Sequence, residues 1–440
     1  MALRIWSFVA LTSLLATAAC HDGGGDPADS SPVVAVPRGA ELPPFAIKIA
    51  PVYTTAAGFL PRPTELDGHV YLRVDPAGLV TGALSLTSGG QAFLAEVTGR
   101  VDDETIVLDT NDVFAAASAR LQWSELRLHL FDGDGDGVID DASGDLSGAL
   151  SESNSEFFEV SPYTAALTAA KDTTASSATI FDGKTRLPFG LVTIDFGEPV
   201  RAEQVALLHV LADGRPVAGS FDAAPVAGLI TSMRFHPEDF LPFDQAISLD
   251  LGGLTDPSGN AITAAASTLR VIADPSPATG NLGFEDGLHG WTVVGHAQST
   301  GSFGGIAPVE GSSQAVIDAV GTLAGYLDVP ADASALHFSL ARLSQLDELA
   351  DNYTATIALH RANGDTITRF DARDATEKPT PCTACAPTYG FQLGPLTGDL
   401  DLTQARGERV WLTIDATSFF FIGVPALSVI VDDLRIVTSK

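Results

Sequence analysis

The sequence predicts an all-β, multidomain fold built of β-sandwiches, and three observations lead to this prediction. Regular helical periodicity is scarce, whereas short β-branched and aromatic runs recur between Gly, Pro, Asn and Asp residues. Hydrophobic residues make up 45% of the chain and charged residues 18%, a composition too apolar for a disordered protein. The 440 residues are enough for roughly two to four domains.

The N-terminal segment is typical of an exported protein. Arg4 precedes an apolar run over residues 5–16 that is too short to span a bilayer as a mature helix, and Ala18 and Ala19 lead to Cys20. This pattern resembles a bacterial lipoprotein signal, although Thr17 stands where Leu is usual. The resemblance implies a signal peptide over 1–20, lipid on Cys20, and a place on the outer membrane or cell surface. A plain secretory signal is the open alternative. The Gly- and Asp-rich residues 21–32 predict a flexible tether.

Residues 33–159 predict an N-terminal β-domain that resembles no family we recognise. Strand-like runs cover 69–74, 81–86, 92–97, 105–108 and 126–131, with turn residues between them. The last of these runs leads directly into an acidic loop, which contains the most specific chemistry of the chain.

The acidic loop, residues 132–141, reads Asp-Gly-Asp-Gly-Asp-Gly-Val-Ile-Asp-Asp. Alternate carboxylates followed by Gly137 at the sixth place match an EF-hand-type calcium loop. The twelfth place is Ser143 rather than Glu, so Asp141 or Asp145 would have to close the site. The predicted Ca²⁺ ligands are Asp132, Asp134, Asp136, the Val138 carbonyl, Asp140 and Asp145. The alternative is a solvated acidic turn that binds nothing.

Residues 160–274 carry ordered motifs of a second domain. Thr193–Val200 reads Thr-Ile-Asp-Phe-Gly-Glu-Pro-Val, and Gly253–Ile262 contains the turn sequence Asp-Pro-Ser-Gly-Asn. The segment resembles the bacterial Ig-like domain of surface-layer and adhesin-type proteins. The resemblance implies a sandwich that acts as a spacer without an active site of its own.

Residues 281–440 predict a third domain. It opens with Asn-Leu-Gly-Phe-Glu-Asp-Gly and then Gly290-Trp291, and it closes with the Asp432-Asp433 strand. This resembles the jelly-roll modules typified by carbohydrate-binding domains of secreted bacterial proteins. The resemblance implies a binding module, with a structural Ca²⁺ held by Glu285 and Asp433. Trp123, Trp291 and Trp411 are candidate sugar-stacking residues, but we expect Trp291, beside Gly290 in the opening strand, in the core, because Trp contributes a large buried area.

Cys382 and Cys385 form a lone Cys-x-x-Cys motif flanked by prolines. In an exported chain this spacing predicts a local disulfide that closes a loop. A zinc site would need two further ligands at matching spacing, and the sequence offers none.

The composition and the missing motifs restrict the function. Lys and Arg number 24 against 55 Asp and Glu, and the net charge of −31 opposes binding to nucleic acid or to an anionic membrane. No common catalytic motif is present. We therefore expect a non-catalytic, calcium-stabilised binding or adhesion protein for a glycan or surface protein, with membrane contact only through its lipid anchor. The alternatives are a structural envelope protein without a ligand, or a secreted hydrolase with its site in residues 33–159.

Overall fold

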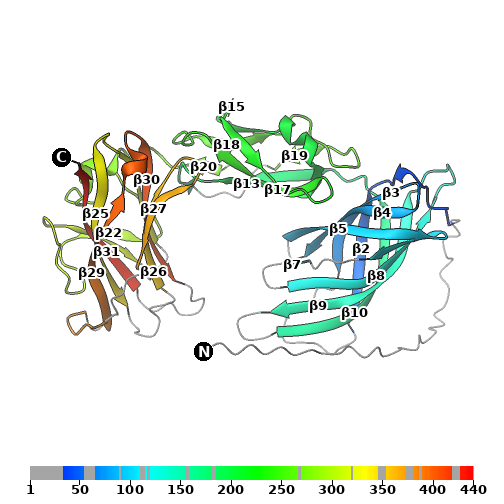
Figure 1. Cartoon of the computed structure of the whole chain (residues 1–440), viewed down its shortest axis with the longest axis horizontal. Coiled ribbons are helices and arrows are strands. Elements are labelled where there is room, and N and C mark those ends of the chain that lie inside the picture. The colour runs from blue at the N-terminus through cyan, green and yellow to red at the C-terminus, as the bar shows by residue number, and fades with distance from the viewer. Residues whose placement is uncertain are drawn as a thin grey trace.

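The chain folds into three all-β domains, and the second lies between the first and the third (Figure 1). The computed structural model describes residues 33–53, 65–88, 91–109, 114–115, 119–153, 158–180, 185–265, 269–318, 321–344, 353–372, 380–385, 389–418 and 427–439. The predicted signal peptide, Cys20 and the tether lie outside these ranges. The all-β, multidomain prediction is confirmed. In the described ranges, no helix has the length and hydropathy to cross a bilayer.

The first domain is a closed, barrel-like antiparallel sheet of eight main strands. Each strand pairs with the next one along the chain, and the last returns to the first. The strands are β2 (Phe45–Tyr53), β3 (Leu66–Val74), β4 (Leu79–Ser88), β5 (Gln91–Asp102), β6 (Thr105–Asp109), β8 (Ala119–Phe131), β9 (Asp141–Ser153) and β10 (Phe158–Lys171). The short strands β1 (Ala40–Glu41) and β7 (Phe114–Ala115) pair with β3 and β8.

Alternating side chains fill the interior of the closed sheet. In β2, Phe45, Ile47 and Ile49 are buried while Lys48 is exposed, as expected for a strand with one apolar face. Eight strands enclose a space that side chains alone can fill. The enclosed cluster is therefore the core of this domain.

Close backbone approach explains some of the glycines in this sheet. A Cβ on Gly82 would lie 1.9 Å from the carbonyl oxygen of Tyr71 in the neighbouring strand, and a Cβ on Gly144 would lie 1.9 Å from that of Arg127. These positions accept only glycine without backbone movement, and such close approaches allow a sheet to bend strongly enough to close.

The predicted boundary at residues 159 and 160 is wrong. Strand β10 pairs with both β9 and β2, so the first sheet extends to Lys171. Tyr163, Ala165 and Leu167 point into the closed sheet. The alternation of residues 160–171 identifies a strand but not its partner, because every strand of this chain alternates in the same way.

The second domain is a sandwich of two five-stranded sheets. One contains β16 (Gly219–Asp222), β17 (Leu229–Pro237), β13 (Val192–Arg201), β11 (Ser176–Ile180) and β19 (Ile262–Ala264). The other contains β12 (Thr185–Arg186), β20 (Leu269–Val271), β18 (Ala246–Asp250), β14 (His209–Ala212) and β15 (Arg215–Pro216). A short 3₁₀ helix, η1 (Ala202–Leu207), follows β13. The sandwich agrees with the predicted architecture, and membership of the Ig-like family stays a prediction.

The third domain is a larger sandwich. One sheet contains β21 (Thr292–Val294), β24 (Gly321–Asp328), β30 (Arg409–Ser418), β26 (Tyr353–His360) and β27 (Thr366–Asp371). The other contains β22 (Ala297–Thr300), β23 (Gln314–Asp318), β31 (Leu427–Thr438), β25 (Ala333–Ser344), β29 (Phe391–Asp401) and β28 (Thr380–Pro381). The 3₁₀ helices η2 (Ala278–Asn281) and η5 (Thr403–Ala405) flank these sheets. Trp291 is buried, as predicted, and Trp411 is buried as well, whereas the side chain of Trp123 lies outside the described residues.

Aromatic packing joins the second and third domains. The ring of Trp411 lies 5.8 Å from that of Phe189 and 6.2 Å from that of Phe243, both in the second domain. Phe189 also stacks on His360 at 5.0 Å, and Gly190 donates its backbone N–H to the carbonyl of Ala362. Trp411 therefore belongs to the apolar cluster of the neighbouring domain.

Candidate metal centres and binding groove

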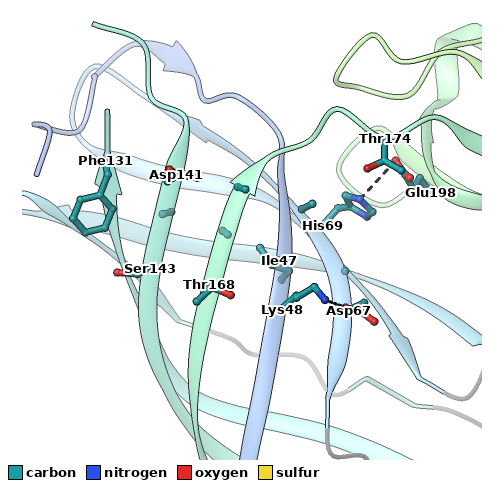
Figure 2. Close-up of a pocket in the computed structure, with 15 residues that line it drawn as sticks. Ile47, Lys48, Asp67, His69, Phe131, Asp141, Ser143, Thr168, Thr174 and Glu198 are labelled. Atoms are coloured by element: carbon teal, nitrogen blue, oxygen red, sulfur yellow. Dashed lines mark ion pairs between the residues drawn. The ribbon is translucent and has the colours of Figure 1, made fainter. Parts of the chain in front are cut away.

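A groove of about 890 Å³ runs over the outer face of the first domain (Figure 2). Phe131 and Asp141 lie at one end, and His69 and Glu198 lie at the other. The complete lining is Ala46, Ile47, Lys48, Asp67, Gly68, His69, Phe131, Asp141, Ala142, Ser143, Thr168, Ala169, Ala170, Thr174 and Glu198. Most lining residues come from β2, β3, β9 and β10, whereas Thr174 and Glu198 follow the first sheet in sequence.

The groove combines small side chains with groups that form hydrogen bonds. Ala46 and Ala170 occupy outward positions of their strands, where larger side chains would fill the groove. Ser143 and Thr168 offer hydroxyl groups, and Lys48 carries an ammonium 3.8 Å from the Asp67 carboxylate. Figure 2 shows Ser143, Thr168 and Lys48 on neighbouring strands of the sheet.

The structure brings together the carboxylates of the acidic loop. Asp132, Asp134, Asp136 and Asp140 each offer one oxygen, and all four oxygens lie within 4.8 Å of one another. Asp132 accepts backbone N–H groups from Gly135 at 2.7 Å and from Gly137 at 2.8 Å. The Gly137 bond, followed by the Gly135 bond, lowers the pKa of Asp132, whereas burial and then the neighbouring carboxylates raise the pKa of Asp140.

The donor set of this loop fits Ca²⁺, which prefers several hard oxygen ligands. Gly137 has a φ of 85°, which supplies the sharp turn predicted at the sixth place. Val138 donates its N–H to Asp136 Oδ1 at 2.7 Å and exposes its side chain. The fit to Ca²⁺ rests on four carboxylates that lie close together, three of which accept hydrogen bonds from backbone N–H groups of the same loop.

Asp145 does not join this cluster. It lies in β9 opposite Arg127, and an extended strand that begins at Asp141 carries it about 13 Å along the sheet. Asp141 lies closer to the loop, because a Cβ on Gly133 would be 3.1 Å from its Oδ2. The prediction of Asp145 as a ligand is therefore wrong.

Glu285 and Asp433 have separate partners. Glu285 accepts hydrogen bonds from the N–H and hydroxyl of Ser312 and from the N–H of Ser313, and these bonds lower its pKa. Asp433 pairs with Arg435, and its other oxygen lies 3.5 Å from His337 Nε2. Among the described residues, neither Glu285 nor Asp433 belongs to a group of three or more side chains that could hold one metal ion.

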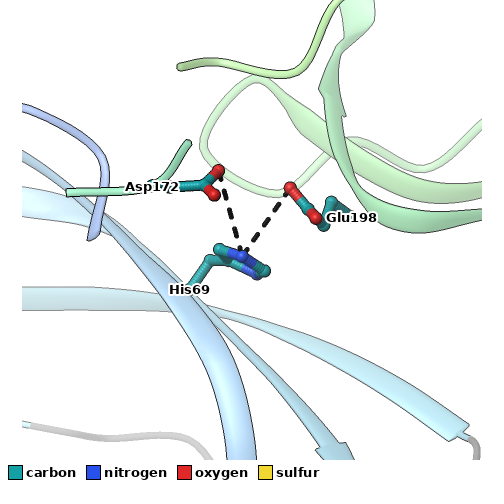
Figure 3. Close-up of side chains that lie close together, drawn as sticks. All are labelled: His69, Asp172 and Glu198. Atoms are coloured by element: carbon teal, nitrogen blue, oxygen red, sulfur yellow. Dashed lines mark ion pairs between the residues drawn. The ribbon is translucent and has the colours of Figure 1, made fainter. Parts of the chain in front are cut away.

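A second cluster lies where the first and second domains meet, and Figure 3 shows three of its members. His69 Nε2 is 3.6 Å from Glu198 Oε2 and 4.0 Å from Asp172 Oδ2. Asp256 is also buried, and its carboxylate raises the pKa of Glu198. We call these four residues the junction cluster: His69, Asp172, Glu198 and Asp256.

Burial and like charge shape the electrostatics of the junction cluster. Burial, followed by the carboxylates of Asp172 and Asp256, raises the pKa of Glu198 to about 8. Burial also lowers the pKa of His69. The cluster therefore favours the neutral imidazole of His69, and it disfavours the charged form of Glu198 unless a cation is present.

Sequence reasoning missed the junction cluster for a specific reason. His69 reads as a strand residue, and Asp256 reads as turn chemistry in Asp-Pro-Ser-Gly-Asn. Asp172 and Glu198 lie in a linker and in β13, so the four residues share no spacing that a motif search can use. Only the packing of two domains brings them together.

Cys382 and Cys385 are joined by a disulfide, with their Cα atoms 5.3 Å apart. Cys385 is buried, and the half-buried rings of Phe303 and Tyr389 pack in the same small cluster. The disulfide lies in the segment that leads from β28 to β29 and closes a local loop.

The sequence matches no family model and no curated protein. Several solved structures show distant similarity, and three of them are carbohydrate-binding modules or related proteins by their descriptions. The module TmCBM61, solved in complex with β-1,4-galactotriose, is 12% identical over 36% of this chain and 96% of its own, with a TM-score of 0.25. SGBP-B from a complex xyloglucan utilization locus in Bacteroides uniformis is 14% identical over 79% of this chain and 95% of its own, with a TM-score of 0.22.

The third is a carbohydrate-binding module of the β-sandwich superfamily, described for its promiscuous specificity. It is 13% identical over 60% of this chain and 99% of its own, with a TM-score of 0.22. At these identities and TM-scores, the similarities assign neither a family nor a ligand to the chain.

Proposed function

We propose that the protein is a non-catalytic, exported binding protein that holds a glycan in the groove of its first domain. The observation that carries this proposal is the groove itself, with Phe131 at one end and polar side chains along its length. Its volume of about 890 Å³ falls within the range of roughly 300–1,000 Å³ typical of small-molecule sites.

The chemistry of the lining suits a short saccharide. A pyranose ring has an apolar face that packs on an aromatic ring such as Phe131, and its hydroxyl groups both donate and accept hydrogen bonds. Ser143, Thr168 and Asp67 provide matching partners on adjacent strands. The small Ala46 and Ala170 leave room for a ring to lie flat.

This proposal moves the binding site from the third domain to the first. Among the described Phe, Tyr and Trp side chains of residues 281–440, several are half-buried as Phe131 is, but the groove described above is lined by the first domain and by Thr174 and Glu198. Trp291 and Trp411, the largest of them, lie in the core. The groove on the first domain therefore offers the better-formed surface for a ligand.

The proposal includes calcium and a lipid anchor. The acidic loop starts directly after Phe131 and ends at Asp141, and both residues line the groove. Calcium held by the loop would fix this end of the groove. Cys20, after its apolar run and before a flexible tether, would hold the protein at the outer membrane or cell surface.

A glycan array followed by affinity electrophoresis of the purified chain tests this proposal. We expect Phe131→Ala to weaken binding to the retained glycan at least tenfold, because the stacking surface is lost. Leu79→Ala is the matched control, since Leu79 is an exposed apolar residue of the same domain that does not line the groove. Equal binding by both variants, with unchanged melting temperatures, contradicts the groove assignment. A chain that retains no glycan supports the structural envelope protein instead.

One observation favours a second candidate, a hydrolase. Glu198 lines the groove, and its pKa of about 8 would keep the carboxyl protonated at neutral pH, as a general acid requires. Incubation with the retained glycan, followed by measurement of new reducing ends, distinguishes the two candidates. Turnover that Glu198→Gln abolishes supports the hydrolase, whereas binding without product supports the binding protein.

A further inference from the structure

The junction cluster has the structure of a prepared site rather than a group of surface acids. Its carboxylates come from the linker after β10, from β13 and from the turn after β18, and its imidazole comes from β3 (Figure 3). Asp172, Glu198 and Asp256 are 3%, 8% and 2% exposed, respectively. Three buried carboxylates in contact are costly without a compensating positive charge.

Two of the carboxylates are held in place by donors. Asp172 accepts hydrogen bonds from the N–H of Thr174 at 3.0 Å and from the hydroxyl of Ser258 at 2.9 Å. The amide of Asn260 donates to Asp256 at 3.0 Å and to Asp172 at 3.4 Å. These hydrogen bonds orient both carboxylates, as hydrogen bonds from neighbouring residues orient the ligands of metal sites.

Glu198 is different, because nothing donates to its inner oxygen. Oε2 is buried without a hydrogen-bond partner, and the side chain is only 9% exposed. Its neighbours are the imidazole of His69, 3.6 Å away, and the carboxylates of Asp172 and Asp256. A carboxylate oxygen can meet two other carboxylates favourably only through a shared proton or a cation.

The donor set indicates the class of cation. Imidazole nitrogen suits Zn²⁺ and related transition metals, whereas Ca²⁺ and Mg²⁺ prefer oxygen ligands alone. Donors about 2.1 Å from a tetrahedral ion lie about 3.4 Å apart. The distances from His69 Nε2 to Glu198 and Asp172 are 3.6 Å and 4.0 Å, so small side-chain movements would complete the geometry.

We propose that the junction cluster binds one divalent cation, with Zn²⁺ best suited, and that this ion ties the first domain to the second. The first domain contributes the imidazole, and the second contributes two carboxylates. An ion shared by both fixes the angle between them. Removal of the ion leaves the apolar contact of Leu229 with Tyr71 and Ala83, and the ion pair of Arg201 with Glu41.

The test uses the purified chain with Asp134→Asn and Asp136→Asn, so that the acidic loop does not contribute metal. This chain is stripped with chelator, dialysed separately against Zn²⁺, Mn²⁺ and Ca²⁺, and freed of unbound ion. Elemental analysis by inductively coupled plasma mass spectrometry then gives the number of metal ions bound per chain. We expect one retained Zn²⁺, no retained Ca²⁺, and a melting temperature that rises with Zn²⁺.

Glu198→Gln and His69→Gln should each abolish the retained ion and the rise in melting temperature. Glu203→Gln is the matched control, because Glu203 is an exposed acid just after the same strand. In chelator we expect Glu198→Gln to be at least as stable as the parent chain, since the amide removes a buried acid. With Zn²⁺ it should be less stable than the parent, a reversal that a misfolded variant does not give.

Three outcomes overturn the proposal. They are a parent chain that retains no Zn²⁺, equal retention by Glu198→Gln and Glu203→Gln, and retention of Ca²⁺ in preference to Zn²⁺. Glycan binding is not measured here, so a negative result leaves the proposed function of the groove unchanged.

Discussion

Individual residues of the acidic loop have different roles. Asp132 accepts two backbone hydrogen bonds within the loop, so it shapes the loop even without a metal ion. Asp134 accepts one longer bond, at 3.1 Å, and is exposed. Its main contribution would be as a calcium ligand.

This difference predicts two kinds of variant in thermal melts. Asp132→Ala should lower the melting temperature by several degrees in calcium and also in chelator, because its backbone bonds are lost in both. Asp134→Asn should lower it only in calcium, since calcium stabilises the fold through binding. If chelator leaves the wild-type melting temperature unchanged, the calcium assignment is wrong.

At the scale of elements, the sequence predicts strands well and their partners poorly. Alternation and turn residues identify β3, β8 and β13, because they report the local environment of each side chain. The pairing of β10 with β2 is a property of the whole sheet, so the boundary near residue 159 was misplaced. The acidic loop is predictable because its ligands are adjacent in sequence. The junction cluster is not, because its ligands meet only after two domains pack.

The closely packed glycines of the first domain give a prediction about strands. Gly82→Ala places a Cβ against the carbonyl of Tyr71, so β3 and β4 must separate or bend. We expect a loss of roughly 2–4 kcal/mol in the free energy of unfolding, comparable to other severe steric changes in a core. Thr81→Ala, an exposed change in the same strand, should cost under about 0.5 kcal/mol. Urea unfolding measures both, and equal losses would contradict the steric explanation.

At the scale of the whole molecule, the junction between the second and third domains should respond to pH. Burial lowers the pKa of His360, whose ring stacks on Phe189 and whose Nε2 lies 3.0 Å from Thr413 Oγ1. The unfolded chain therefore binds a proton here more readily than the folded one. The stabilising effect of neutral His360 is complete above the ordinary pKa of about 6.5 and decreases as the pH falls below it.

We therefore expect the melting temperature of the wild-type chain to fall relative to that of His360→Gln as the pH goes from 7.5 to 5.5. Other groups titrate over the same range: His69 has a lowered pKa and Glu198 a raised one, and these shifts change the stability in opposite directions, so only the comparison of the two proteins isolates His360. An identical pH dependence of the two melting temperatures would show that protonation of His360 does not affect this junction.

The closed sheet of the first domain has a consequence for crowding at a surface. An open sheet ends in strands with unpaired backbone groups, and such edges recruit strands from other copies. In the first domain β10 returns to β2 and β3 pairs with β4, so the main strands complete one another's hydrogen bonding. Many copies placed side by side would therefore resist aggregation through the first domain. Edge strands of the second domain, such as β15 and β16, would be more vulnerable to pairing between copies.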